Sequence, residues 1–267
     1  MTIHDDHPRR DSLLSRQKIV DAQKKGLLAD SALIAHGRGE AFDYLLGGCT
    51  IPSARRAEEE SVNRLAAARC PVISLNGNST VLAGRDAVKL AALVGCKIEI
   101  NIFYRTDSRV NLLSKTLNLI KNEVASEKPS DEITSEIWSQ MVANVEILGT
   151  RPDAQIPGLE GPRAKCCSRG IHIADTVLVP LEDGDRCEAL IQMGKQVIVV
   201  DLNPLSRTAR TANVTIVDNV SRAFNEMVKI ALEKPASPDT TWDNRTTLID
   251  AIDTMGKAAV RSFDQDD

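Results

Sequence analysis

The stretch ADTVLVPLEDGDRCEALIQMGKQVIVVDLNPLSRTARTANVTIVDN, residues 174–219, decides the fold of this chain. It contains three short runs rich in Val and Ile, at residues 176–180, 196–200 and 214–217, and an amphipathic segment at 186–193 separates the first two. Short apolar runs joined by a helical segment are typical of parallel strands connected by right-handed crossovers. The stretch therefore predicts part of a parallel α/β sheet.

Two polar loops follow the first two of these strands, LEDGDR at 181–186 and DLNPLSRTART at 201–211. Ligands of such sheets bind outside the carboxyl ends of the strands, so both loops are expected to face one crevice. Asp201 ends its strand and is placed to accept hydrogen bonds from ribose hydroxyls. Gly184 is expected to let the backbone approach a ligand where a helix begins. The two loops together indicate a nucleotide site.

The charged side chains of these loops can bind phosphate only if a cation lies between the phosphate and the carboxylates. Arg186, Arg207 and Arg210 offer forked donors for phosphate oxygens. Several carboxylates in the same loops would repel phosphate, and Mg²⁺ is the natural ion to stand between them. The alternative is a solvated turn beside an arginine-rich surface loop. The carboxylates belong to Glu182, Asp183, Asp185, Glu188 and Asp201.

The composition indicates a soluble globular protein. With 267 residues, of which 42% are hydrophobic and 26% charged, the chain is long enough to bury a substantial core. A formal net charge of −4 disfavours nucleic acid or an anionic membrane as the main partner. The apolar runs are too short to cross a bilayer and the start lacks a signal-peptide core, so we expect a cytoplasmic protein. The six cysteines include no C-x-x-C pair, which disfavours zinc.

Residues 1–70 are expected to be mainly helical. Residues 8–26 show an amphipathic pattern in which Arg16 lies near the apolar face and so points toward a cleft. Residues 51–69 carry a proline in the first turn and charges along one side, which predicts a helix with a solvated face.

Arg38 is bracketed by Gly37 and Gly39 where a second helix, opening near residue 30 or 31, is expected to end within 35–47. Such small neighbours would let the backbone curl close to an anion held by the guanidinium. His36 beside them is either an acid–base group or an ordinary hydrogen-bonding residue.

Residues 71–95 predict a strand, a loop and a helix, and 97–106 predict a strand that ends at Asn101, Tyr104 and Arg105. The loop after the first strand offers neutral donors and a glycine, which suit a phosphate or a carboxylate. Neither G-K-[ST] nor G-x-G-x-x-G is present, so the common ATPase and dinucleotide motifs are missing. The loop residues are Asn76, Gly77, Asn78, Ser79 and Thr80.

The connection at 153–177 is rich in Gly and Pro, and we expect a long irregular loop there. Its basic residues make it a candidate to close on an anion, although an exposed basic loop explains them equally well. Helices are expected at 220–233 and 242–260, the second of which would dock on the sheet or on a second subunit. The residues of the 153–177 connection that are candidates to close on an anion are Arg163, Lys165, Ser168, Arg169 and Gly170.

Long motifs extend over nearly the whole chain from Pro8: HPRRDSLLSR (7–16), LIAHGRGEAFDYL (33–45), PVISLNGN (71–78), NIFYRT (101–106), IPGLEG (156–161), VLVPLEDGDR (177–186), DLNPLSRTART (201–211) and VTIVDN (214–219). By these motifs the chain resembles the archaeal phosphopantothenate synthetase family, also called 4-phosphopantoate–beta-alanine ligases. It departs from the family's pattern in the acidic start MTIHDDH, in Cys166 and Cys167, and in extra sequence around 125–145.

The resemblance implies a Rossmann-like α/β fold, a mostly parallel sheet flanked by helices with an N-terminal helical extension. A single domain is expected, with 1–70 as the extension, 71–233 as the Rossmann-like core and 242–262 as a C-terminal helix. The family is understood to use ATP to join (R)-4-phosphopantoate to beta-alanine, giving 4'-phosphopantothenate, AMP and diphosphate in coenzyme A biosynthesis. It is also understood to form homodimers.

The loop chemistry and the resemblance together assign three sets of site residues, in which ATP binding by Arg16 and Arg38 is implied by the resemblance alone. Arg38, Arg186 and Arg207 are expected to act in catalysis by stabilising charge on the phosphates. Residues expected to bind ATP are Arg16, Arg38, Glu182, Asp183, Gly184, Asp185, Arg186, Asp201, Leu202 and Asn203. Residues expected to bind the second substrate are Asn76, Gly77, Asn78, Tyr104 and Arg105. The sequence assigns neither the Mg²⁺ ligands nor the group that takes the proton from the amine.

Two functions from other classes stay open beside a ligase. A nicotinamide-dependent oxidoreductase would use the same fold, but the chain has no glycine fingerprint for a dinucleotide. A non-catalytic, nucleotide-binding regulatory protein would need the two loops but no collection of sites for three anionic reactants.

Overall fold

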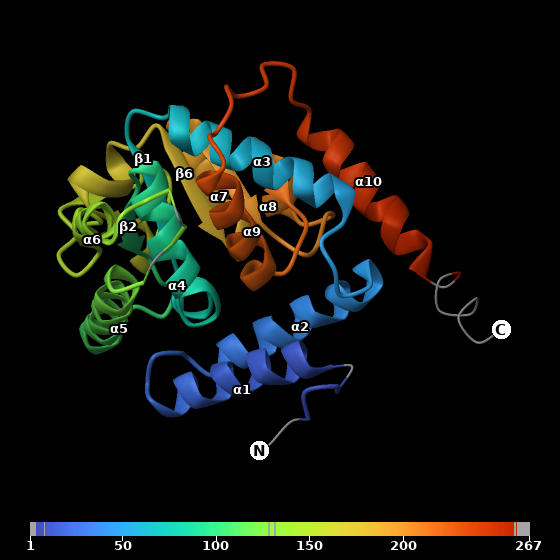
Figure 1. Ribbon diagram of the computed structural model, residues 1–267, viewed down its shortest axis with the longest axis horizontal. Helices are drawn as coiled ribbons and strands as arrows, with labels where there is room; N and C mark the ends of the chain where they lie inside the picture. Colours follow the sequence, from blue (N-terminus) through green and yellow to red (C-terminus); the bar gives the residue numbers. More distant parts are fainter. Residues whose placement is uncertain (1–3, 8, 128, 131, 259, 261–267) are drawn as a thin grey trace.

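A six-stranded parallel sheet forms the centre of the computed structural model, which describes residues 4–7, 9–127, 129–130, 132–258 and 260 (Figure 1). In spatial order the strands are β3 (Ile147–Leu148), β2 (Lys97–Ile100), β1 (Pro71–Leu75), β6 (Thr176–Pro180), β7 (Gln196–Val200) and β8 (Val214–Ile216). The chain runs outward from β1 to β3, crosses back beside β1 and runs outward again from β6 to β8. This order defines a Rossmann-like fold, with its switch point between β1 and β6.

Helices and an irregular connection cover the two faces of the sheet, which explains why the strands read as continuous apolar runs. The helices around the sheet are α3 (Pro52–Ala67), α4 (Gly77–Val94), α5 (Asp107–Ala125), α6 (Ser135–Ala143), α7 (Gly184–Gln192), α8 (Arg207–Thr211) and α9 (Val220–Leu232). One face packs on α3, α4, α5 and α9 through residues such as Ile73 and Ile198. The other face packs on α7 and the 153–177 connection through residues such as Val177 and Val199.

Two N-terminal helices, α1 (Arg10–Lys24) and α2 (Ser31–Leu46), lie side by side at the bottom of Figure 1. Both contact α4, and α2 also contacts α10 (Asn244–Gly256), which packs in turn on α3 and α8. The amide of Asn78 at the start of α4 donates to the carbonyl of Ala32 on α2, at 3.0 Å. The helix pair is thereby held next to the carboxyl end of β1, where α4 begins.

The predicted Rossmann-like α/β fold is confirmed, with two differences in element length. The strand predicted at 97–106 ends at Ile100, because its partner β1 ends at Leu75 and no strand edge is left to pair with. The loop predicted at 76–80 is almost entirely helix, since α4 already begins at Gly77. In the part of the chain that the structure describes, no helix has both the length and the apolar composition to cross a bilayer.

The backbone curl predicted around Arg38 is wrong, because α2 continues through Gly37 and Gly39 to Leu46. A Cβ on Gly39 would lie 3.5 Å from Cδ1 of Leu202, in the loop after β7. This is an ordinary van der Waals distance, so Gly39 lies in the helix beside that loop and does not bend the chain around an anion.

The 153–177 connection is more regular than predicted. It contains the antiparallel pair β4 (Ala154–Gln155) and β5 (Lys165–Cys166), a 3-10 turn η1 (Pro162–Ala164) and a π-helical turn η2 (Ser168–His172). Glu99 on β2 orders η2, because its carboxylate accepts hydrogen bonds from the backbone N–H of Cys167 and Ile171 at 2.8 and 2.7 Å. A Cβ on Gly170 would lie 2.0 Å from Oε2 of Glu99, so only glycine fits there.

Some predictions fall on residues outside the described part of the chain. These are residues 1–3 of the acidic start and of the predicted extension, Pro8 in the first motif, residues 128 and 131 in the 125–145 segment, and residues 259, 261 and 262 of the predicted C-terminal helix. The division of the chain into an extension, a core and a C-terminal helix stays a prediction.

Candidate active site

A large cavity of about 1520 Å³ lies between the α1–α2 pair and the carboxyl ends of the strands. Its floor includes Asn76 after β1, Asn101 after β2, Leu181 and Asp183 after β6, and Leu202 after β7. This is the edge at which Rossmann-like folds bind their ligands. The loops after β6 and β7 do face one crevice, as the sequence predicted.

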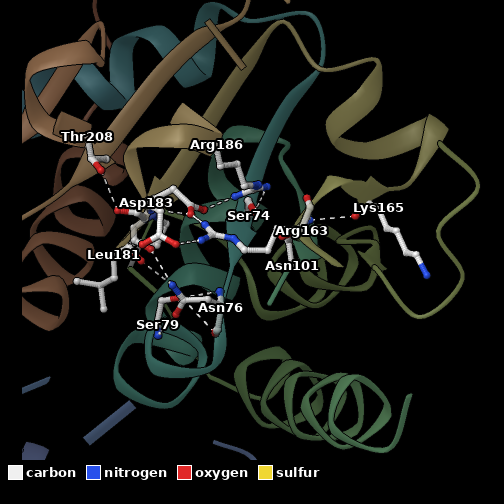
Figure 2. Close-up of polar contacts among 12 residues, drawn as sticks. Ser74, Asn76, Ser79, Asn101, Arg163, Lys165, Leu181, Asp183, Arg186 and Thr208 are labelled. Atoms are coloured by element: carbon white, nitrogen blue, oxygen red, sulfur yellow. Dashed lines mark hydrogen bonds and ion pairs between the residues drawn. The ribbon is translucent and has the colours of Figure 1, made fainter. Parts of the chain in front are cut away.

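Asn76 joins the two strands at the switch point. Its side-chain oxygen accepts the backbone N–H of Ser79 at 3.0 Å, which caps α4. Its side-chain NH₂ donates to the carbonyls of Pro180 and Leu181, at 3.2 and 2.8 Å (Figure 2). The side chain of Asn76 is thus committed to the scaffold, while the N-terminus of α4 at Gly77 faces the cavity.

Leu181 adopts a left-handed backbone conformation, with φ of 56°, and is the only non-glycine residue with positive φ in the described part of the chain. Its N–H donates to the carbonyl of Val200 at 3.0 Å, and its own carbonyl accepts from Asn76. Such a conformation costs roughly 1–3 kcal/mol and concentrates at functional sites. The strained residue leads directly into the acidic turn that starts at Glu182.

A buried group of charges lies beneath this turn (Figure 2). Arg186 is only 1% exposed, and its guanidinium donates to Glu182, itself 3% exposed, and to Oγ of Ser74 at 2.9 Å. Arg163, from the 153–177 connection, forms ion pairs with both Glu182 and Asp183. Burial lowers the pKa of Arg186 to about 10. Burial and the neighbouring charge of Arg186 likewise lower the pKa of Arg163 to about 10.

Four of the residues predicted to bind ATP at this turn lie outside the cavity lining: Glu182, Gly184, Asp185 and Arg186. A Cβ on Gly184 would lie 2.3 Å from Nε of Arg207, so the close approach that the sequence predicted is made by this arginine and not by a ligand. Arg207 is about half exposed and pairs with Asp185 and, at 3.5 Å, with Glu188. Asp183 is the member of the turn that reaches the cavity.

Asp201 shapes the loop after β7. One carboxylate oxygen accepts the N–H of Asn203 at 2.9 Å, and the other accepts the hydroxyl of Ser206. Burial raises the pKa of Asp201, although both hydrogen bonds favour its charged form. Neither Asp201 nor Asn203 lines the cavity, whereas Leu202 between them does.

The helical side of the cavity carries Arg38 and His36 on α2. Arg38 is exposed and has no ion-pair or hydrogen-bond partner among the described residues. Nε2 of His36 is buried and has no hydrogen-bond partner among the residues that the structure describes, and burial lowers the pKa of this imidazole, which is therefore neutral at pH 7. Arg16 lies outside the cavity lining and pairs with Glu40 at 2.7 Å.

The residues predicted to bind the second substrate are partly brought together. Gly77, Asn78 and Tyr104 line the cavity with Asn76, and the ring of Tyr104 packs edge-on against Phe103 with centroids 5.0 Å apart. Arg105 lies outside the lining and donates to the carbonyl of Gly149.

The sequence analysis also missed a bridged group of charges at the cavity. Arg222 on α9 bridges Asp43 on α2 and Asp218 after β8, and Thr50 donates to the same Asp218 at 2.6 Å. Arg222 and Asp43 line the cavity. The i,i+4 spacing of Asp218 and Arg222 directly after an apolar strand was the available signal.

The strand order and the cavity define a Rossmann-like α/β protein with its ligand site at the carboxyl edge of the sheet. The family model of the phosphopantothenate/pantothenate synthetases matches residues 53–261. The chain belongs to this family, as its motifs predicted.

Relatives of similar length support the assignment. A protein of Thermococcus kodakarensis named 4-phosphopantoate–beta-alanine ligase is 46% identical over 253 residues, which covers 92% of this chain and 89% of the relative. A protein of the same name from Methanosarcina mazei is 44% identical over 254 residues, which covers 92% of this chain and 91% of the relative.

Proposed function

We propose that this protein is an ATP-dependent ligase that joins (R)-4-phosphopantoate to beta-alanine and releases 4'-phosphopantothenate, AMP and diphosphate in coenzyme A biosynthesis. The names of its relatives support this substrate set. The observation that most supports it is the cavity of about 1520 Å³ at the carboxyl edge of the sheet. Pockets for one drug-sized ligand measure about 300–1,000 Å³, so a nucleotide and a second substrate fit here together.

The chemistry requires activation of a carboxylate, which is a poor electrophile. In the proposed route the carboxylate of phosphopantoate attacks the α-phosphorus of ATP and expels diphosphate, and the amine of beta-alanine then displaces AMP from the acyl-adenylate. Charge on the departing diphosphate is stabilised by fixed cations. Arg38, exposed on the helical side of the cavity, is the proposed contact for the polyphosphate.

The sheet side of the cavity is proposed to position the reactants. Arg186 is proposed to fix the position of Glu182, the first residue of the acidic turn, and Arg207 to fix the position of Asp185. The N-terminus of α4 at Gly77, with Asn78 beside it, is the proposed contact for the phosphate of phosphopantoate, because free backbone N–H groups favour an anion there. Alignment of the reactants supplies much of the rate acceleration.

Mg²⁺ fits the carboxylates of the acidic turn. Within the described ranges no group of three or more His, Cys, Asp and Glu side chains could hold a metal on its own. Mg²⁺ commonly takes one or two carboxylates and completes its shell with substrate phosphates and water. Asp183 and Asp185 are 62% and 66% exposed and are the proposed ligands. The ion would neutralise phosphate charge when bound.

A homodimer is the proposed assembly. Exposed apolar side chains lie on the two helices that pack against each other at the edge of the molecule, namely Leu45 on α2 and Ile249 and Ile252 on α10. Sedimentation of the purified chain tests this, and a monomer at micromolar concentration would contradict it.

The activity test is direct. Purified protein is incubated with ATP, 4-phosphopantoate and beta-alanine, and AMP and 4'-phosphopantothenate are measured. Binding of ATP without AMP formation would favour the nucleotide-binding regulatory protein. With ¹⁸O in the carboxylate of phosphopantoate, one label is expected in AMP. Label in inorganic phosphate, with ADP as the other product, would show an acyl-phosphate route instead.

A further inference from the structure

Arg163 lies at the cavity but has no role in the reaction proposed above. The side-chain NH₂ of Asn101, at the end of β2, donates to the carbonyls of Arg163 and Lys165 at 3.2 and 3.0 Å and so anchors this part of the connection. The side chain of Lys165 points away from the network (Figure 2), and Arg169 lies outside the cavity lining. Arg163 is therefore the basic residue of the 153–177 connection that faces the cavity.

The surroundings of Arg163 restrict its guanidinium to one place. Its side chain is 11% exposed and lies over the ring of Phe103, with Cζ 5.8 Å from the ring centroid. The guanidinium pairs with Glu182 and with Asp183, and Asp183 is the N-cap residue of α7. The charge of Arg163 is thus held at the N-terminus of this nine-residue helix, where the helix dipole also favours an anion.

The two carboxylates that pair with Arg163 differ in their burial and in their other partners, so a ligand can displace one more easily than the other. Glu182 is 3% exposed and has a second, deeper cation in Arg186, which Ser74 holds in turn. Asp183 is 62% exposed and makes no side-chain capping bond to α7. Two arginines and two carboxylates balance in this cluster. If Asp183 turns out to solvent, one positive charge is left uncompensated at the cavity.

We propose that Arg163 binds the polyphosphate of ATP, and that Asp183 occupies its guanidinium until the nucleotide arrives. Phosphate oxygens replace the exposed carboxylate of Asp183, while Glu182 and Arg186 keep the floor beneath them unchanged. The inference rests on the proposed function in one respect only, namely that the phosphates belong to ATP.

The test measures binding of α,β-methylene-ATP, which cannot be cleaved at the α–β bond, by calorimetry in EDTA. Arg163→Ala is expected to weaken binding about 10- to 100-fold, the usual effect of losing a charge-assisted hydrogen bond. Arg163→Lys keeps the charge but loses the fork and is expected to fall between Ala and wild type. Arg169→Ala, an exposed arginine of the same connection, is the matched control and is expected to bind like wild type.

The direction in which a second variant changes the affinity distinguishes phosphate binding by Arg163 from a purely structural role of its ion pair. Asp183→Asn breaks the same ion pair from the other side. If Arg163 binds phosphate, Asp183→Asn binds the analogue at least as tightly as wild type, because a competitor is removed and, in EDTA, Asp183 has no Mg²⁺ to hold. If the ion pair only holds the turn in place, both variants weaken binding, and this result overturns the proposal. Arg163→Gln serves where Arg163→Ala does not fold, and wild-type affinity in a folded Arg163→Gln also overturns it.

The outcome is distinguishable from failure of the proposed function. AMP formation by the wild-type protein tests the ligase activity alone. If the wild type forms AMP and Arg163→Ala binds the analogue normally, the inference fails and the function stands. If the wild type forms no AMP while Arg163→Ala loses the analogue, Arg163 binds nucleotide in a protein with another activity.

Discussion

The two walls of the cavity hold their arginines in opposite ways. On the sheet wall, Arg186 and Glu182 are 1% and 3% exposed and bonded to each other. On the helical wall, Arg38 is exposed and without a partner among the described residues. A buried, bonded pair is fixed before a ligand arrives, whereas an exposed arginine is ordered by the ligand. Substitutions on the sheet wall should therefore change folding and activity together, and those on the helical wall activity alone.

Arg186→Ala should have the largest effect. Breaking a buried ion pair by removing one partner costs about 3–5 kcal/mol, and here Glu182 would keep only Arg163 as its cation. We expect the free energy of unfolding, measured by urea titration, to fall by about this amount and the ligase activity to be lost with it. An unfolding midpoint equal to that of wild type would show that the pair does not hold the wall.

The junction of the two walls should make stability depend on pH. Glu58 on α3 is fully buried, and both its carboxylate oxygens lack a hydrogen-bond partner among the described residues. Burial, with the nearby charge of Asp218, raises the pKa of Glu58 to about 8, although Arg55 and Arg222 oppose the shift. Arg222 is also the residue that ties α2 to the core through Asp43. The buried carboxyl thus lies beneath the link between the walls.

The sign of this pH effect follows from the raised pKa of Glu58. In the unfolded chain the group loses its proton near pH 4.5, whereas in the folded protein it keeps the proton up to about pH 8. The stability present at low pH is therefore lost as the pH rises through this window, at up to roughly 1.4 kcal/mol per pH unit. Glu58→Gln should flatten the profile in urea titrations between pH 5 and 8. A variant with the same slope as wild type would assign the effect to another group.

On the helical wall, Arg38→Ala should lower kcat/KM for ATP about 10- to 100-fold and leave the unfolding midpoint unchanged. Arg38→Lys should recover little of this loss if the guanidinium contacts phosphate with two nitrogens. Arg151→Ala, an exposed arginine outside the cavity, is the control. A destabilised Arg38→Ala would remove the proposed difference between the walls.

The sequence predicted the elements of the sheet wall but not the direction of its side chains. The apolar runs within 174–219 predict β6, β7 and β8 correctly, because buried parallel strands leave a strong local signal. Arg186 was expected to reach a ligand. It turns inward because Ser74, more than a hundred residues away in the chain, lies beneath it. Position 184 likewise requires glycine because the side chain of Arg207 packs against it. No local sequence pattern reveals this contact.

Some of the side-chain contacts that the sequence analysis did not predict had a local signal in the sequence. Glu182 directly precedes the N-cap of α7 and Arg186 follows four residues later, a spacing that favours a pair between them over two separate ligand contacts. The two glycines around Arg38 gave a misleading signal, because both lie inside α2, where the chain stays helical in spite of them.

The smallest effect is expected at the loop after β7, where binding and folding roles must be separated. Asp201→Asn should raise KM for ATP about tenfold, and KM for beta-alanine much less, if its carboxylate accepts a bond from the nucleotide. Ser206 donates to the same carboxylate and also caps α8 by accepting the N–H of Ala209 at 2.9 Å. Ser206→Ala should therefore cost about 1 kcal/mol of stability with little change in KM for ATP. If Ser206→Ala raises this KM as much as Asp201→Asn does, Asp201 acts only through the shape of the loop and makes no contact with the nucleotide.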